Sequence, residues 1–451
     1  MFDVNIATVL VVSLLAMVAL GVHIAIALGM TSALGIFLVT GGNLDIVLAM
    51  LASTSYEALR AYEFAVIPLF MLMGEFIGKS GAVTDIYQAI HRSLRRIPGR
   101  LAVATLLGNA IFSFVTGVSI ASAAAFSRIA YPEMKRFGYD RGFALGTISG
   151  SSCLGMLIPP SVLMIVWGLL TENSIGQIFL AGVLPGFLLV SLFVTYVLVI
   201  ALLRPNLVGS GRGQAVAEVQ THAPDSTQSA SARQVWSSAI GIIFVIVAVL
   251  GGIWFGVFTP TEGAGAGAFI GLVLAIAKGM RYRQVIDSIL SVGRTSAPIL
   301  LLLVSAALYS RTLAMTGVSN AIQDTFLGTD MLPWMILAAM VGIWFMLGMV
   351  IDSISIMLLT VTIFEPIAVN LGYDPIAFAI VGILAIEAGL LTPPFGLLVY
   401  TVKAAIQDED DDISIMRIFQ SSTPYWIIML IGMIAIASYP QIATYLPSLV
   451  F

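Results

Sequence analysis

Residues 150–161 read GSSCLGMLIPPS, and residues 387–394 read EAGLLTPP. Neither stretch is predicted to form one continuous helix, because each proline lacks an amide donor and clashes with the preceding turn. Within a bilayer, such breaks are tolerated only where the unwound backbone is buried in protein or lines a cavity. We therefore expect two broken helices in a membrane protein, with a simple kink in each helix as the alternative.

The composition indicates an all-α polytopic membrane protein. Of its 451 residues, 59% are hydrophobic and only 10% are charged, whereas about a quarter are charged in a soluble protein. Apolar runs of about 20 residues or more, long enough to cross the hydrocarbon core as helices, include 9–27, 178–203 and 240–258, and a shorter apolar run lies at 426–438. We expect roughly ten full spans and two helical hairpins. The first run lacks a basic n-region and a clear cleavage site, so we interpret it as a retained span and not a signal peptide.

Several classes of function are disfavoured by the same sequence. Cys153 is the only cysteine, so the chain forms no internal disulfide, and the three histidines lack ligand-like spacing. The net charge is −4 and no basic patch suggests nucleic acid. The sequence contains no phosphate-binding loop that would indicate ATP hydrolysis. It also contains no combination of nucleophile and base, and no metal-binding cluster, that would indicate an intramembrane enzyme. We therefore expect no enzymatic activity, no cofactor and no metal other than coupling ions.

The chain matches itself when it is shifted by 234 residues. Residues 119–163 align without gaps with residues 353–397, and 12 of the 45 positions are identical. Both copies contain Gly-Tyr-Asp, at 138–140 and 372–374, followed at one spacing by Gly-x-Leu-x-Pro-Pro. General similarity between apolar helices does not produce such matches, so we infer an internal duplication.

The two copies carry opposite charge around their Gly-Tyr-Asp loops. The first loop is flanked by Lys135, Arg136 and Arg141, and just upstream lie Arg92, Arg95, Arg96 and Arg100. The second copy has no Lys or Arg between Arg311 and Lys403, and its loop carries Glu365 and Asp374. The positive-inside rule places the first loop in the cytoplasm and the second outside. The repeat is therefore predicted to be inverted, as is common in secondary transporters.

Two further segments are predicted to be cytoplasmic. Residues 205–235 are rich in Gly, Ser, Gln and Ala and lack hydrophobic periodicity, which is typical of a flexible linker between the halves. Residues 408–412 read DEDDD, which we interpret as a solvated acidic loop.

A helical hairpin is predicted before each break. The first turns near 116–122, between apolar arms at 101–115 and 120–130, and the second turns near 348–355. These arms are too short and too closely spaced for ordinary crossings, so we expect re-entrant pairs. Their turns supply glycine for tight backbone geometry and hydroxyl groups as hard oxygen donors.

Acidic residues near these elements suggest ion coupling. A carboxylate at membrane depth costs at least about 2.5–3.5 kcal/mol unless it is paired, and no basic residue lies near Asp352 in the sequence. A sodium ion is a natural partner, and capping of the following helix is a compatible alternative. Glu387 is open between cation binding, proton relay and structural pairing. For Arg311 and Glu262 we expect structural pairs.

Unwound segments offer carbonyl oxygens to cations, and exposed helix N-termini favour anions. The candidate sodium ligands are Thr116, Gly117, Ser119, Ser122, Gly150, Ser151, Ser152, Gly155, Asp352, Ser353, Ser355, Gly389 and Thr392. The candidate substrate contacts are Ser119, Pro159, Pro160, Ser353, Pro393 and Pro394. For Ser151 and Ser152, close helix packing is an equal alternative.

Taken together, these motifs resemble the large membrane subunit of tripartite ATP-independent periplasmic (TRAP) transporters. The similarity covers nearly the whole chain. The linker is longer than usual, Thr116-Gly117 stands where Ser-Gly is common, and Cys153 is not a motif residue. The residues that carry the resemblance are Gly117–Ser122, Pro132–Lys135, Gly138–Asp140, Gly155–Ser161, Phe258–Glu262, Asp352-Ser353 and Gly389–Pro394.

That resemblance implies an inverted-repeat ion-transporter-type fold and an elevator mechanism. A scaffold would comprise the first three spans and those between about Trp236 and Leu313, and the hairpins and broken helices would move. The expected segments are 1–100 (first scaffold spans and basic arm), 101–204 (first transport part), 205–235 (linker), 236–331 (second scaffold spans) and 332–451 (second transport part).

The resemblance also implies sodium-coupled uptake of an organic acid, a carboxylate, across the bacterial inner membrane. A periplasmic binding protein would deliver the substrate, and a small four-helix membrane subunit, expected as a separate chain, would be an obligate partner. The alternative is a standalone sodium-coupled carboxylate carrier or sodium/proton antiporter of related fold. The identity of the acid does not follow from the sequence.

Overall fold

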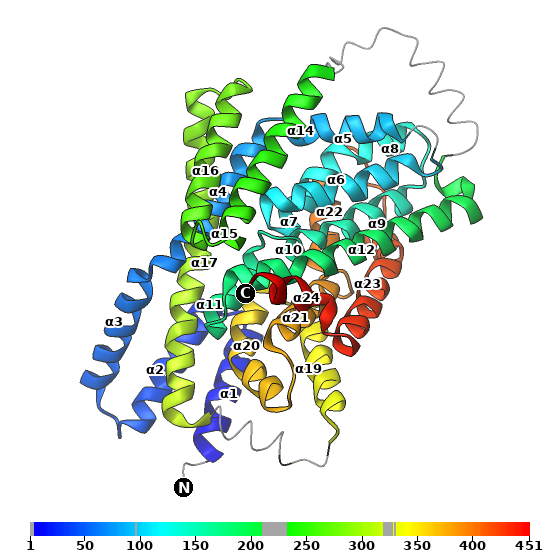
Figure 1. Ribbon diagram of the computed structural model, residues 1–451. Coiled ribbons are helices and arrows are strands. Elements are labelled where there is room, and N and C mark those ends of the chain that lie inside the picture. Colours follow the sequence, from blue (N-terminus) through cyan, green and yellow to red (C-terminus); the bar gives the residue numbers. More distant parts are fainter. Residues whose placement is uncertain (1–3, 95–96, 210–231, 319–327, 329–330) are drawn as a thin grey trace.

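The computed structural model describes residues 4–94, 97–209, 232–318, 328 and 331–451, and their regular structure is helical (Figure 1). The middle of the predicted linker, with Arg95 and Arg96, lies outside these residues.

One group of helices forms the left side of the molecule in Figure 1, where α4 packs along α16 and α17 along α2. Helices α4 and α16 approach closely at Gly267, which has no side chain. A Cβ atom at this position would lie 2.6 Å from the Met73 sulfur. This group contains the elements predicted for the scaffold. Its helices are α1 (Val4–Ala19), α2 (Ile24–Val39), α3 (Leu44–Arg60), α4 (Val66–Lys79), α14 (Ala232–Ile246), α15 (Gly252–Trp254), α16 (Pro260–Ala277) and α17 (Tyr282–Thr316).

The number of long helices differs from the prediction. In the described part of the chain, seven helices are long and apolar enough to cross a membrane, or up to eight if the bent α3–α4 pair is one span. The apolar run 9–27 is interrupted by a turn in which Gly21 has φ +78°. Of the shorter apolar helices, Arg100–Thr116 and Pro333–Gly348 belong to the hairpins and Pro375–Gly389 to a broken helix, whereas Thr8–Ala19 and Ile24–Val39 lie in the first helix group. The α3–α4 bend of 55° was not predicted, because residues 60–65 at the bend contain no proline or glycine.

The second group contains the hairpins and the broken helices. Helices α6 and α7 form one hairpin and α19 and α20 the other, and both turns fall within the predicted residues. The path α9–α10–α11 breaks at 158–161, and α21–α22 breaks at 390–396, again as predicted. These helices are α5 (Ala82–Ser93), α6 (Arg100–Thr116), α7 (Ser119–Ile129), α8 (Tyr131–Arg136), α9 (Arg141–Ser152), α10 (Leu154–Leu157), α11 (Val162–Thr171), α12 (Ile175–Leu203), α19 (Pro333–Gly348), α20 (Ser353–Asn370), α21 (Pro375–Gly389), α22 (Leu397–Ala405), α23 (Ile415–Ser438) and α24 (Gln441–Val450).

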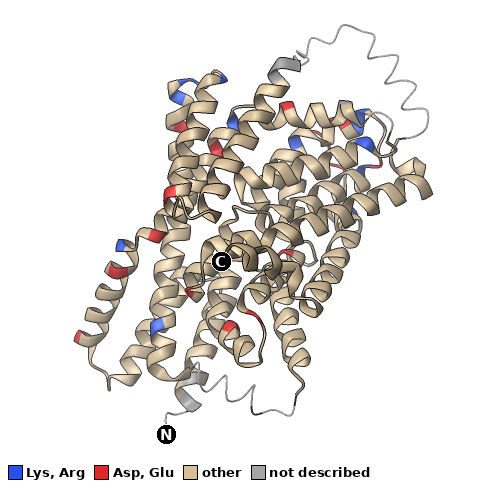
Figure 2. Ribbon diagram, viewed as in Figure 1, with Lys and Arg blue, Asp and Glu red and all other residues tan. Residues whose placement is uncertain are grey.

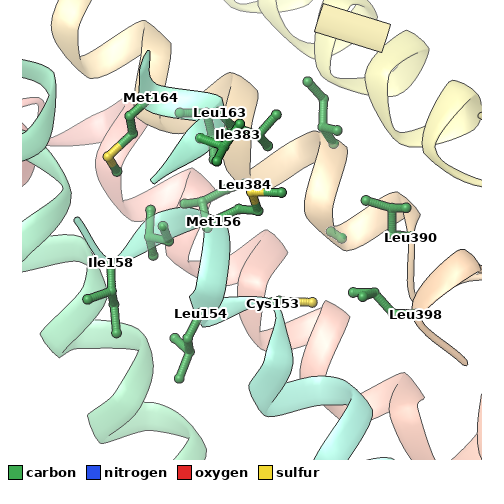
Figure 3. Packing of buried hydrophobic residues seen from close by; sticks show 14 of the residues in the cluster. Cys153, Leu154, Met156, Ile158, Leu163, Met164, Ile383, Leu384, Leu390 and Leu398 are labelled. Carbon is green, nitrogen blue, oxygen red and sulfur yellow. The ribbon is translucent and has the colours of Figure 1, made fainter. Parts of the chain in front are cut away.

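A shared core joins the two halves of the chain in this group. Trp167 of α11 packs edge-on against Trp344 of α19, with ring centroids 5.8 Å apart, and both contact Phe378 of α21. In Figure 3, Leu163 and Met156 lie beside Ile383 and Leu384 of α21, and all four are buried. Broken helix 1 therefore packs directly against the first part of broken helix 2.

The start of the predicted linker is ordered. Residues Pro205–Leu207 form a 3₁₀ turn, and Leu207 accepts a hydrogen bond from the Asp140 amide at 3.0 Å. Val208 forms an isolated bridge with Tyr139. The beginning of the predicted flexible segment is thus docked on the first Gly-Tyr-Asp loop, and a helix begins at Ala232.

Lysine and arginine gather at the end of the molecule drawn uppermost in Figure 2, which we call the basic end. There the acidic loop is not simply solvated, as the sequence suggests, because the Asp410 side chain is only 4% exposed. Tyr131 donates a hydrogen bond to it at 2.5 Å, and Arg141 and Lys135 approach it at 2.8 and 3.3 Å. This contact, the Asp410 clasp, ties the second half to the first.

Replacing Asp410 with asparagine is expected to destabilise the protein by about 1–3 kcal/mol, because the clasp is a set of hydrogen bonds to a charged acceptor. Burial raises the pKa of Asp410, but the Tyr131 hydroxyl and the two cations outweigh it and hold that pKa below its usual 3.8. The stabilisation is therefore present above pH 3.8 and is lost as the pH falls through the lower folded-state value. Thermal unfolding in detergent measures the effect. The control is Asp411→Asn, whose side chain is 73% exposed and which should change little; equal shifts for the two variants would contradict the clasp.

Candidate functional site

The tip of the first hairpin is held against the first break. Gly117 ends α6 with φ +60°, and its carbonyl accepts a hydrogen bond from the Val162 amide at 3.1 Å, just after the proline pair. A Cβ at Gly117 would lie 2.4 Å from the Pro160 carbonyl oxygen, and one at Gly155 would lie 2.9 Å from the Ser119 amide nitrogen. Glycine is needed at both positions because backbone meets backbone there.

The second hairpin repeats this arrangement. The Phe395 amide, just after the second proline pair, donates a hydrogen bond to the Met349 carbonyl in the hairpin turn at 3.1 Å. A Cβ at Gly389 would lie 2.7 Å from the Gly348 Cα atom. Each hairpin is therefore docked on the broken helix of its own repeat, as the duplication predicts.

Glu387 connects the two hairpins. Its carboxylate accepts a 2.6 Å hydrogen bond from the Ser119 hydroxyl and a 2.9 Å hydrogen bond from the Ser353 hydroxyl. The Glu387 residue is 1% exposed, and within the described residues no basic group forms an ion pair with it. A buried carboxylate is costly unless it is neutralised, so this position calls for a bound cation or a proton.

The centre of the repeat lies beside the same carboxylate. Ser119 and Ser353 are equivalent under the 234-residue shift, and so are Cys153 and Glu387. The Cys153 thiol lies 3.7 Å from the Glu387 carbonyl oxygen. Two pairs of equivalent residues thus meet at one point, but only one of the four carries a charge. The sequence alone leaves the role of Glu387 open and does not single out Cys153; their equivalence under the shift was the available signal.

Other predicted cation ligands differ in how free they are to bind. Ser122 is fully buried and its hydroxyl oxygen has no hydrogen-bond partner among the described residues, so it is available as a ligand. Ser151 accepts a hydrogen bond from Asn109 at 2.6 Å, and Ser152 donates to the Ser149 carbonyl at 2.6 Å, which favours a packing role for both. Thr116 donates to the Phe112 carbonyl within α6, and Thr392, in the second break, donates to the Gly389 carbonyl at the end of α21. A Cβ at Gly150 would overlap the ring of Tyr425, so this glycine serves packing.

Asp352 does not join the Glu387 cluster. It caps α20 by accepting a hydrogen bond from the Ser355 amide at 3.0 Å. Together with Ser355, Asp352 lines a separate cavity of about 310 Å³, which is completed by the α1–α2 turn at His23 and by Leu302 of α17. The structure thus brings Ser119, Ser353 and Glu387 together, and places Asp352 between hairpin 2 and the first helix group.

The four predicted proline contacts are not equivalent. Pro159 and Pro160 are buried, whereas Pro393 and Pro394 are exposed and are followed by Phe395 at 58% exposure. Only the second break is therefore exposed at the surface of the chain.

The expected structural pairs occur in modified form. Arg311 approaches Thr54 at 2.8 Å and Glu57 at 3.4 Å, both on α3. Glu262 instead forms a capping box with Thr259 at the start of α16.

Comparisons with known proteins agree with this architecture. Residues 11–442 match the sequence profile of a family described as the DctM component of the tripartite ATP-independent periplasmic transporter. The chain is 29% identical to the C4-dicarboxylate TRAP transporter large permease protein of Pseudomonas aeruginosa, over 93% of both chains. It is 25% identical to the ectoine TRAP transporter large permease protein of Halomonas elongata, over 98% of this chain and 99% of that one. Among solved structures, the YdaH transporter of Alcanivorax borkumensis covers 88% of both chains with a TM-score of 0.60 and 14% identity, which concerns the fold alone.

Proposed function

Because the chain belongs to the DctM family of TRAP transporters, and is therefore a multi-pass membrane permease subunit and not an enzyme, we propose that it imports an organic acid together with sodium ions across the bacterial inner membrane. The observation that carries the proposal is the Glu387 carboxylate, which is buried without a basic partner among the described residues and is held by both hairpin tips.

Sodium coupling is supported by the chemistry of this cluster. Sodium is a hard cation, and carboxylate, hydroxyl and carbonyl oxygens are its natural ligands. Glu387, the unpartnered Ser122 hydroxyl and the carbonyls freed at the two breaks supply such oxygens near the hairpin tips. Asp352 with Ser355 supplies a second group of oxygens, so we propose two cation sites, each with one carboxylate.

The substrate is proposed to be a carboxylate that approaches the second break. Its exposed Pro393, Pro394 and Phe395 offer apolar contacts, and the Ser353 hydroxyl lies at the tip of the hairpin docked there. The C4-dicarboxylate permease of Pseudomonas aeruginosa agrees with this substrate class.

We further propose that the basic end faces the cytoplasm and that the repeat is inverted in the membrane. The hairpins and broken helices would move as one body against the scaffold in an elevator mechanism. Their shared aromatic core and the Asp410 clasp support movement as a unit. As one component of a tripartite system, the chain would work with a periplasmic binding protein and a small membrane subunit on a separate chain.

The test is uptake into proteoliposomes, with the substrate first identified from the ligand of the purified binding protein. Uptake should require a sodium gradient, the binding protein and the small subunit. If this chain alone transported the substrate at full rate, the standalone carrier would be the better interpretation. Absence of any effect of sodium would remove the coupling proposal.

Asp352→Ala is expected to weaken the sodium dependence of this uptake, raising the sodium concentration for half-maximal rate about tenfold. The reason is the loss of one charged ligand, a change on the order of 1.4 kcal/mol. Asp374→Ala is the matched control, since Asp374 also caps its helix through side-chain hydrogen bonds, at 2.9 Å, and removal of a cap costs about 1 kcal/mol in either helix. Equal sodium curves for the two variants would assign Asp352 to capping alone.

A further inference from the structure

A cleft of about 500 Å³ separates the first hairpin from α4 and α17 of the first helix group and from α5. One wall is formed by α4, α5 and α17, and the other by α6 and α7. Thr116 and Val118 lie at the hairpin tip, whereas Lys79 and Arg128 lie near the ends of α4 and α7 at the basic end. The cleft therefore extends from the basic end to the residue next to Ser119, whose hydroxyl binds Glu387.

The charge of the cleft is carried by Arg128. Lys79 forms a 2.8 Å ion pair with Glu75, which also lines the cleft, so these two charges offset each other. Arg128 is exposed, and among the described residues no hydrogen bond or ion pair engages it. Apart from Ile129, its neighbours on α7 that line the cleft are small, namely Ala121, Ala124 and Ala125. The guanidinium therefore has space around it, and its donors are free of partners in the described part of the chain.

Such a group is suited to an organic anion. An arginine side chain presents a planar fork of donors that matches a carboxylate in a bidentate manner. Low-dielectric walls concentrate the field of an unpaired charge within a cleft. Among the described residues that line this cleft, Glu75 is the one carboxylate that could compete for Arg128, and Lys79 already engages it.

We propose that Arg128 forms a carboxylate site in this cleft, distinct from the cluster at the hairpin tips, where an organic anion is held on its way between the tip of hairpin 1 and the basic end. The direction of that movement rests on the proposed function, but binding of a small carboxylate at Arg128 does not.

The experiment uses the full-length chain in detergent, with Ser291→Cys as a reporter on the α17 wall of the cleft. The only native cysteine, Cys153, is buried and provides a background that is measured in the parent chain. The rate of modification by N-ethylmaleimide is followed with succinate or with chloride at equal ionic strength. With Arg128 present, succinate at about twice its dissociation constant should slow labelling about threefold, since protection follows one plus the ratio of ligand to dissociation constant.

Arg128→Gln should abolish this protection, and Arg128→Lys should retain part of it. Arg294→Gln is the matched control, because Arg294 lies on α17 near the reporter but does not line the cleft, and it should leave protection unchanged. The proposed site would be refuted if succinate protected the reporter equally with and without Arg128. It would also be refuted if succinate gave no protection in the reporter chain that retains Arg128. Persistent protection without any uptake in proteoliposomes would instead refute the proposed transport and leave the site standing.

Discussion

Replacing Glu387 with glutamine is expected to lower substrate uptake about 100-fold or more. The carboxylate accepts hydrogen bonds from Ser119 and Ser353 through different oxygens. A glutamine offers one acceptor oxygen, and its amide group cannot accept the second hydroxyl. Each hydrogen bond to a charged group contributes about 1.5–3 kcal/mol, which is tenfold to more than a hundredfold in an equilibrium. Loss of the charge also removes the reason for a cation to bind beside it.

The measurement is the initial rate of uptake in proteoliposomes at a series of sodium concentrations. We expect the residual rate of Glu387→Gln to have lost its dependence on sodium. Glu365→Gln provides the control, because Glu365 is a partly buried glutamate in the same half that accepts a 3.4 Å hydrogen bond from Asn173, away from the hairpin tips. Wild-type sodium dependence in the Glu387 variant would show that this carboxylate is only a structural link between the hairpins.

Much of the architecture could be predicted because the repeat and the backbone signals are local. Prolines 159–160 and 393–394 located both breaks, and the glycine-rich, hydroxyl-rich turns located both hairpin tips. The 234-residue shift then predicted that each hairpin would resemble the other. The α3–α4 bend escaped prediction because residues 60–65, where the two helices meet, contain neither glycine nor proline.

Long-range pairings are what the sequence did not reveal. The Ser119–Glu387 contact joins residues 268 positions apart, and the Tyr131–Asp410 contact joins residues 279 apart. Which side chains meet across the two halves depends on how the halves pack, and no local pattern encodes it. Asp352 illustrates the same limit, since its cap was visible from sequence but its cavity with His23 was not.

The two copies of the repeat are similar enough in structure to bring equivalent residues together. The side chains at these equivalent positions nevertheless differ in chemistry. Cys153 and Glu387 occupy equivalent positions, and only the second can neutralise a cation. The first break is buried while the second is exposed. The duplication thus supplies two docking sites for hairpins. The charge between the hairpins depends on one pair of equivalent positions, Cys153 in the first copy and Glu387 in the second.

Replacing Gly74 with leucine is expected to lower uptake about tenfold or more while the protein still reaches the membrane. Gly74 lies on α4, and a Cβ there would be 2.6 Å from the Val115 carbonyl oxygen and 3.0 Å from the Thr116 Cα atom in the last turn of α6. Both neighbours are backbone atoms, so neither can rotate away. Overpacking typically costs about 1–3 kcal/mol, which would disfavour this conformation about fivefold to more than a hundredfold.

If the hairpins slide along the scaffold, α4 and the tip of hairpin 1 must approach this closely during each transport cycle, and leucine prevents it. Gly29→Leu is the matched control, because Gly29 lies in a scaffold helix where a Cβ would meet no atom within 4 Å, and this variant should transport normally. Uptake and thermal unfolding are measured for both variants. Normal transport by Gly74→Leu would show that the close contact between α4 and hairpin 1 is dispensable. Such a result would contradict a mechanism in which hairpin 1 slides along α4 at Gly74.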